Sequence, residues 1–158
     1  MKVLAVNRKA KHDYKIIKKE LAGIKLKGHE VKSVKTGHIT LKGAYVVFYK
    51  GEPYLVGAHI PLYQHANSIS RSGYDPERMR KLLMTKQQIE RWKTLRKTQK
   101  LVVVPLKIVL KNGLIKVEVG LARPLRKPDK RKKSKERAEK RQAERESKMF
   151  RASASVVN

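Results

Sequence analysis

The chain changes character after Ala122, and this change limits which part can fold around a core. Residues 1–122 alternate apolar and polar side chains, as a folded domain does, and carry a net charge of +18. Residues 123–151 hold fourteen Lys and Arg against five Asp and Glu, a net charge of +9, and show no apolar stripe. We therefore divide the chain into a folded body, 1–122, and a basic tail, 123–158.

Both parts are basic, and together they give the 158 residues a net charge of +27. A basic folded body joined to a basic tail is typical of a protein that fits a shaped polyanion and extends an arm along it. Structured RNA is the first candidate partner, DNA the second, and an anionic membrane a distant third.

The remaining composition narrows the class of protein. Hydrophobic residues make up 40% of the chain, enough for the modest core of one domain, and cysteine is absent. The absence of cysteine excludes disulfides and thiolate metal sites. The apolar start, residues 1–6, is too short for a signal peptide, and no run approaches the roughly 20 apolar residues of a membrane span. We expect a soluble, cytoplasmic protein without a membrane segment.

The first half of the body contains a strand, a short helix and a hairpin. Ile24 and Leu26 alternate with lysines, which predicts a strand that Gly28 ends. Residues 30–35 place Val31 and Val34 on one face of a short helix. Apolar runs at 45–49 and 54–56 flank a glycine turn, which predicts a hairpin.

The second half combines helix starts with a stronger hairpin. Asp75-Pro76-Glu77 is typical of a helix start, and Met79, Leu82 and Leu83 would form the apolar stripe of that helix. A capping box of Thr85 and Gln88 predicts a second helix, on which Ile89, Trp92 and Leu95 share a face.

The hairpin has the clearest local signal in the chain. Apolar residues 101–110 and alternating residues 115–121 flank Asn112-Gly113, a turn pair that favours tight hairpins. Pro105 predicts an edge or a bulge in the first of these strands. Strands with helices inserted between them favour a mainly β fold, a small barrel like the oligonucleotide-binding (OB) fold. An open α+β sheet is the alternative.

The tail favours helix without a core-facing side. Glu136 and Lys140, and Glu144 and Lys148, are correctly oriented i,i+4 pairs, each worth roughly 0.2–0.5 kcal/mol. Crowding among the other Lys and Arg opposes them. We expect a tail that is largely disordered when free and becomes helical when phosphates neutralise it.

The sequence offers little chemistry for catalysis. The thirteen carboxylates do not cluster, and Gly37 and Gly43 lack the Gly-Lys-Ser/Thr ending of a phosphate loop. His59 and His65 have no Cys and no carboxylate nearby, so we interpret them as satisfied or surface histidines. We expect no enzyme activity, no metal and no cofactor.

RNA binding has better physical support. Lys and Arg supply phosphate contacts, and six aromatic residues could stack on bases if exposed, although we expect Tyr45 and Trp92 in the core. The six aromatics are Tyr14, Tyr45, Tyr54, Tyr63, Tyr74 and Trp92. The cluster at residues 7–12, before the first expected strand, mixes cations with donors and acceptors. It is either a contact surface or a solvated terminus.

Motifs in the same order along nearly the whole chain resemble those of the SsrA-binding protein (small protein B) family. They are NRKAKHDY (7–14), AGI (22–24), GHEVKS (28–33), GE (51–52), AHI (58–60), DP (75–76), RKLL (80–83), VPLK (104–107), KNG (111–113), GLA (120–122) and DKR (129–131). Three positions depart from the family pattern: Leu21 stands where Glu is common, Pro124-Leu125-Arg126 where Gly-Lys-Lys is usual, and Pro128 where an aromatic or His is common.

The resemblance implies an OB-like barrel and a role in bacterial ribosome rescue. The body would grip the tRNA-like domain of transfer-messenger RNA (tmRNA), and the tail would enter the vacant messenger channel of a stalled ribosome and become helical there. The protein would be a monomeric, non-catalytic adaptor in trans-translation, with tmRNA and the small-subunit decoding region of the ribosome as partners. A ribosomal or ribosome-assembly protein that binds ribosomal RNA is the alternative.

Matching positions give the candidate site residues. The resemblance implies tmRNA contacts by Asn7, Arg8, Lys9, Lys11, His12 and Lys81, with Glu30 and Lys32 shaping or lining the same surface. Glu30 has a competing structural role in the first turn of its helix. In the tail, the residues implied to contact the ribosome are Asp129, Lys130, Arg131, Lys132 and Lys133.

Overall fold

The computed structural model describes the backbone of residues 1–125 and 127–157, and the side chains of residues 1–125 and 131–148. The chain divides into two compact units, Met1–Pro124 and Leu125–Asn158, which are treated separately below.

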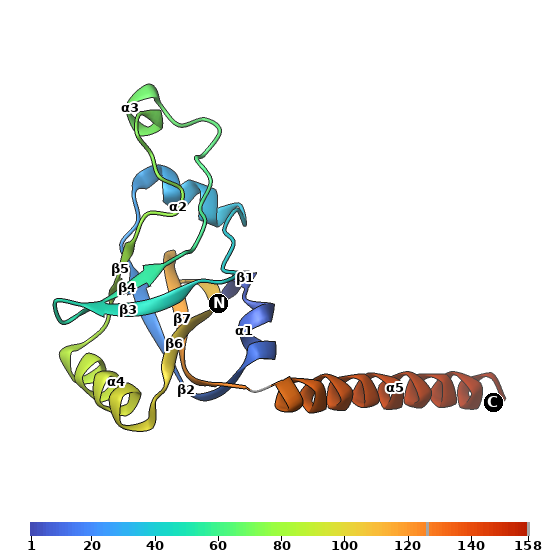
Figure 1. The fold of residues 1–158 in the computed structure, drawn as a ribbon. Coiled ribbons are helices and arrows are strands. Elements are labelled where there is room, and N and C mark those ends of the chain that lie inside the picture. Colours follow the sequence, from blue (N-terminus) through green and yellow to red (C-terminus); the bar gives the residue numbers. More distant parts are fainter. Residues whose placement is uncertain (126, 158) are drawn as a thin grey trace. The chain divides into compact units, whose positions relative to one another are not determined.

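In the first unit the described strands form an antiparallel barrel (Figure 1). Their order is β1-β6-β3-β4-β5-β2-β7, and a further pairing of β6 with β7 closes six strands into a ring with β1 beside β6. This architecture confirms the predicted mainly β, OB-like barrel. The alternative, an open α+β sheet, is not observed in the barrel unit. The strands are β1 (Lys2–Val6), β2 (Tyr14–Ile24), β3 (Tyr45–Tyr49), β4 (Glu52–Val56), β5 (Arg80–Leu83), β6 (Val102–Lys111) and β7 (Leu114–Pro124).

Helices connect the strands of the barrel. The helix α4 lies toward one end of the barrel, and α2 and α3 lie toward the other (Figure 1). The core holds apolar side chains from the strands, Val34 of α2 and Trp92 of α4, which is fully buried. In the first unit the described helices are α1 (Arg8–Asp13), α2 (Gly28–Lys35), α3 (Ser68–Arg71) and α4 (Lys86–Gln99).

Three predictions that depended on local signals are confirmed. Thr85 caps α4 through the predicted capping box with Gln88. In the β6–β7 turn both Asn112 and Gly113 have positive φ, as a type I′ turn requires. The register between β6 and β7 shifts at Pro105, which is the predicted bulge.

The prediction of a helix after Asp75 is wrong, because this segment contains a turn followed by β5. The Asp75 side chain accepts a hydrogen bond from the Glu77 N–H at 2.9 Å. This contact, which could have capped a helix, stabilises a turn. Leu82 is fully buried whereas Leu83 is 54% exposed, which is the alternation of a strand. Pairing of β5 with both β2 and β4 overrides the local helix signal.

The first strands also differ from the prediction. β2 begins at Tyr14, ten residues before the expected strand, and ends at Ile24, so Leu26 lies beyond it. β1 precedes residues 7–12, which therefore lie between two strands, mostly as the helix α1. The charged residues Lys15, Lys18, Lys19 and Glu20 of β2 hid its length, because they look like a polar loop in the sequence.

In the second unit, the helix α5 (Lys127–Val157) contains most of the tail, whose first residues, Arg123 and Pro124, belong to β7. We expect a peptide of residues 125–158 to be mostly unfolded in dilute buffer, because each i,i+4 pair of its helix adds only roughly 0.2–0.5 kcal/mol and its many like charges repel one another. Adding a short RNA duplex should raise its helix content. Far-ultraviolet circular dichroism would measure both states, and a stable helix in plain buffer at low concentration would contradict this expectation.

Candidate nucleic-acid interface

Asn7 holds the helix α1 against the barrel. Its side-chain oxygen accepts from the Ala10 N–H at 3.1 Å, and its Nδ2 donates to the carbonyl oxygens of Pro105 and Leu41 at 2.9 and 3.3 Å. The side chain is buried, at 4% exposure, and its polar atoms are used inside the protein. The Asn7 side chain is thus held inside the fold, where it positions α1.

The helix α1 presents a compact group of cations. Ala10 is buried against β6, and Arg8, Lys9 and Lys11 are exposed. His12 is half-buried, and its Nδ1 lies 3.0 Å from Asp13 Oδ1. Three long cationic side chains within one turn are suited to phosphate contacts. The structure thus brings the predicted Arg8, Lys9 and Lys11 together on one rigid support.

Lys32 and Lys81 belong to other elements. Lys32 is exposed on α2, and its Nζ lies 5.8 Å from the centre of the Tyr63 ring. Lys81 is half-buried in β5, where it pairs with Tyr54 of β4. The predicted set is therefore distributed over three elements of the barrel unit.

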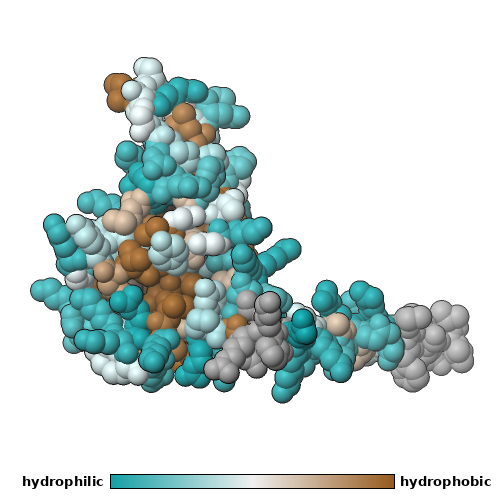
Figure 2. Space-filling model, viewed as in Figure 1, coloured by the Kyte–Doolittle hydropathy of each residue, from teal (hydrophilic) through white to brown (hydrophobic). Residues whose placement is uncertain are grey.

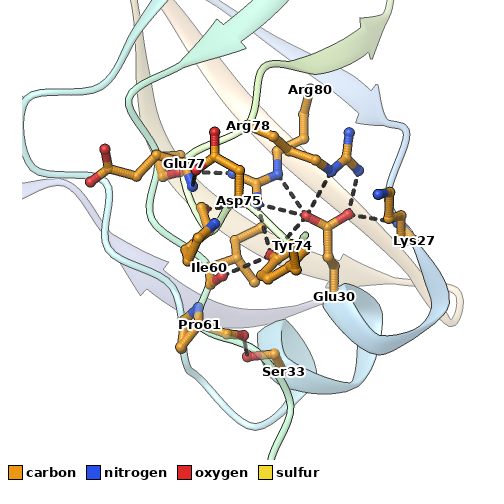
Figure 3. A network of polar contacts seen from close by, with 12 residues as sticks. Lys27, Glu30, Ser33, Ile60, Pro61, Tyr74, Asp75, Glu77, Arg78 and Arg80 are labelled. Carbon is orange, nitrogen blue, oxygen red and sulfur yellow. Dashed lines mark hydrogen bonds and ion pairs between the residues drawn. The ribbon is translucent and has the colours of Figure 1, made fainter. Parts of the chain in front are cut away.

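Glu30 lies in a buried ionic network, and Figure 3 shows its contacts. Arg80 donates to Glu30 Oε2 from Nε at 2.9 Å and from Nη2 at 2.6 Å. Arg78 donates from both Nε and Nη2, and the Lys27 N–H donates at 2.8 Å. Tyr74 Oη lies 3.1 Å from Glu30 Oε2. The Glu30 and Arg80 side chains are both fully buried.

This network fastens α2 to the segment that carries α3 and leads into β5. Arg80 also donates to the carbonyl oxygens of Ala58 and Pro76, at 2.8 and 2.9 Å. Tyr74 Oη donates to the Ile60 carbonyl oxygen at 2.8 Å. Glu30 therefore does not line a surface for RNA. Its competing structural role holds, and it shapes the surface from inside.

The network lowers the pKa of Glu30. Burial by itself raises this pKa, but the hydrogen bonds from Arg78, the Lys27 N–H and Arg80 outweigh it, and the pKa falls from 4.5 to about 2. Burial and the negative charge of Glu30 raise the pKa of Tyr74 to about 12. Glu30 is thus a carboxylate, and Tyr74 a neutral phenol, at neutral pH.

We expect Glu30 to make stability depend on pH in acid. Because its pKa is lower in the folded state, its charge stabilises the fold above pH 4.5, and this stabilisation is lost as the pH falls toward 2. The difference in free energy of unfolding between the native chain and Glu30→Gln should be constant above about pH 5 and shrink below it. Urea denaturation at a series of pH values would measure the difference. A difference that persists unchanged to pH 2 would contradict a charged Glu30.

The aromatic residues divide into buried and exposed groups. Trp92 is fully buried, as predicted. Tyr45 is 48% exposed, so the prediction that it lies in the core is wrong. Tyr45 alternates along β3 with the buried Val46, a period-two signal that the sequence already contained. Tyr45 lines a groove of about 390 Å³ beside α1, which Lys9 also lines.

The tail residues lie on α5 as far as they are described. Arg131 and Lys132 are exposed, and Lys133 is half-buried, with its pKa lowered by burial and by Arg137. The side chains of Asp129 and Lys130, like that of Pro128, lie outside the described residues.

The histidines discussed above for metal binding lie on the surface. His59 is 46% exposed, with Nδ1 3.6 Å from Glu77 Oε1, and His65 contacts Gln64. Among the described residues no group of three His, Asp or Glu side chains could hold a metal ion. Within the described part of the chain, no helix has both the length and the hydrophobicity needed to cross a membrane.

The chain is similar to known proteins over most of its length. The family model for the SmpB protein matches residues 4–149. The SsrA-binding protein of Geobacillus thermodenitrificans (strain NG80-2) is 41% identical over 144 residues, 91% of each chain. That of Bacillus licheniformis is 44% identical over 144 residues, 91% of this chain and 90% of the relative.

A solved structure agrees with the sequence comparisons. A chain in the structure described as "tmRNA-SmpB: a journey to the center of the bacterial ribosome" superposes with a TM-score of 0.63 at 39% identity, covering 78% of this chain and 85% of that one. These matches confirm the resemblance seen in the motifs. With the barrel fold and a match that runs from β1 into α5, the chain belongs to the SmpB family of SsrA-binding proteins.

Proposed function

We propose that this protein binds the tRNA-like domain of tmRNA and delivers it to stalled ribosomes for trans-translation. The observation that carries the proposal is the match of the family model over residues 4–149, which includes both the barrel and most of the tail. The relatives are named for binding SsrA, and the similar solved structure joins SmpB with tmRNA and the bacterial ribosome.

The barrel surface supports RNA recognition by shape and charge. The cations Arg8, Lys9 and Lys11 project from a helix that Asn7 fixes to the barrel, so their positions are set before RNA binds. Lys32 and Lys81 add cations on two other elements of the barrel unit, α2 and β5. We assign phosphate contacts to these five residues, a further contact to His12, and a supporting role to Asn7 and Glu30.

The tail supports a separate role on the ribosome. We propose that α5 occupies the empty messenger channel, with Asp129, Lys130, Arg131, Lys132 and Lys133 at the decoding region. Its exposed cations and lack of a core-facing stripe fit a helix that is surrounded by RNA phosphates. The protein would act in the cytoplasm as a monomeric adaptor and contribute no catalytic step.

A salt-dependent binding titration tests the proposed function. The full chain is titrated with the tRNA-like fragment of tmRNA, an ordinary tRNA and a DNA duplex of similar size. We expect a preference for the first that persists as salt rises. Equal affinities that fall together with salt would reject shape recognition, and would favour a ribosomal RNA-binding or a DNA-compacting protein.

The Lys9→Ala variant tests the phosphate contact of α1. We expect it to weaken binding to all RNAs alike and to reduce the slope of log affinity against log salt by roughly one contact, because one fewer counterion is released. Fluorescence anisotropy at several salt concentrations would measure the slope. Lys111→Ala, an exposed lysine at the β6–β7 turn, is the matched control. An unchanged slope for Lys9→Ala would reject this contact.

A further inference from the structure

A groove between α1, β3 and β6 combines an apolar wall with cations at its rim. The exposed side chains of Lys9 and Arg96 line it together with Tyr14, Tyr45, Val47 and Val102, and its volume is about 390 Å³. Figure 2 shows the apolar patch on this side of the barrel unit, with hydrophilic side chains around it. The 48% exposure of Tyr45 leaves much of its ring open to a ligand.

A second hollow continues from the first along α4. Arg96 lines both, and its guanidinium carbon lies 5.3 Å from the centre of the Phe48 ring. Lys93, Lys97 and Lys100 also line the second hollow. Lys93, Arg96 and Lys97 occupy positions i, i+3 and i+4 on one face of α4, and Lys100 is the C-cap of that helix, in the left-handed conformation. Among the described residues that line this hollow none is acidic, and Lys93 Nζ also lies 3.8 Å from Oε1 of the neighbouring Glu90.

The two hollows together have the chemistry of a site for an unpaired nucleotide. Aromatic and aliphatic walls suit the face of a nucleobase, and a row of cations suits the phosphates that adjoin it. A base inside a duplex cannot present its face, since its neighbours stack on it. The excess of cations over the one lining carboxylate, Asp13, disfavours a basic partner.

We propose that this groove binds one unpaired nucleotide of the RNA, with its base against Tyr45 and its flanking phosphates along Arg96, Lys93, Lys97 and Lys100. The inference rests on the proposed RNA-binding function and adds a site to it. Lys9 joins the groove to the cations of α1, so a single RNA could contact both.

Two RNA hairpins, each closed by a non-nucleotide linker so that neither has loop bases, test the site; one is fully paired, and the other has the same stem with a single bulged nucleotide. The full chain should bind the bulged hairpin about 5- to 150-fold more tightly, as stacking of one base on an aromatic ring allows. Tyr45→Ala should remove this preference and Tyr45→Phe should keep it. The matched control is Tyr49→Ala, an exposed tyrosine on the same strand that lines neither hollow.

The salt dependence of binding tests the phosphate track. A double Lys97→Ala, Lys100→Ala variant should keep the preference for the bulge and reduce the salt slope by roughly two contacts. The ratio of the affinities for the two hairpins reports the contribution of the groove, because the basic tail contributes equally to both affinities.

Each outcome is decisive. Equal binding of both hairpins by the native chain would overturn the site while leaving RNA binding intact, whereas failure to bind either hairpin would overturn the proposed function itself. A preference that survives Tyr45→Ala would place the nucleotide elsewhere. A glutamate-rich peptide that competes with the bulged hairpin, and loses its affinity on Tyr45→Ala, would identify a peptide site and overturn the inference.

Discussion

A Glu30→Ala variant is expected to unfold with a free energy about 3–5 kcal/mol lower than that of the native chain. The change removes the carboxylate that pairs with the buried Arg80 and the neighbouring Arg78. A guanidinium that is left buried without a counter-charge is far more costly than a lost surface pair. Urea denaturation followed by circular dichroism would measure the change, which is a large share of the stability of a small domain.

The same variant should loosen the segment between β4 and β5. Arg80 and Tyr74 reach the backbone at Ala58 and Ile60, so loss of Glu30 weakens both anchors of this segment. Limited proteolysis should cut at Arg71 faster in Glu30→Ala than in the native chain. Glu77→Ala is the matched control, because Glu77 is 65% exposed and pairs only with His59 among the ion pairs of the described residues. Glu77→Ala should lower the free energy of unfolding by about 1 kcal/mol or less. Equal stability of the two variants would reject the structural role of Glu30.

Removal of residues 125–158 is expected to abolish tagging on stalled ribosomes while sparing the binding of free tmRNA. The deletion begins at Leu125 because β7 continues to Pro124, where it pairs with Tyr14 of β2. The barrel is a compact unit without the tail, and the α1 cations belong to the barrel. A reconstituted translation assay on truncated messages would measure tagging, and anisotropy would measure binding of the tRNA-like fragment.

A shuffled tail of identical composition is the control for charge. If α5 works through its positions in the messenger channel, the shuffled chain should bind free RNA as the native chain does and still fail to tag. Tagging by the tailless protein would overturn the division of labour between barrel and tail. Full tagging by the shuffled chain would show that the charge of the tail alone suffices.

The sequence predicted best where the structural signal was local. The Asn112-Gly113 turn, the Thr85 cap and the alternation of β7 each depend on neighbours within a few residues, so the pattern and the structure agree. The helix expected after Asp75 failed because β5 pairs with strands that lie far away in the chain. Pairing of this kind outweighs local propensity and is invisible in a single segment.

The candidate site also divides into residues that local sequence could identify and residues whose role depends on distant contacts. The sequence predicted the cations Arg8, Lys9 and Lys11 through the residue types at 7–12 together with the family resemblance, because exposed Lys and Arg need only solvent around them. It could not separate these from Asn7 and Glu30, whose polar groups are used inside the fold by partners up to 98 residues away. The groove at Tyr45 was missed as well, since it forms only where β3, β6, α1 and α4 meet.

The sequence by itself determined the division of charge and, through its ordered motifs, the family, and it favoured a mainly β barrel over an open α+β sheet. Composition and short-range patterns carry this information, because charge and side-chain alternation are properties of the chain before it folds. Only the tertiary structure decided which polar residues are buried, that residues 80–83 form a strand, and where aromatic and cationic side chains converge. Burial and convergence depend on contacts between distant segments, and these contacts exist only once the barrel has closed.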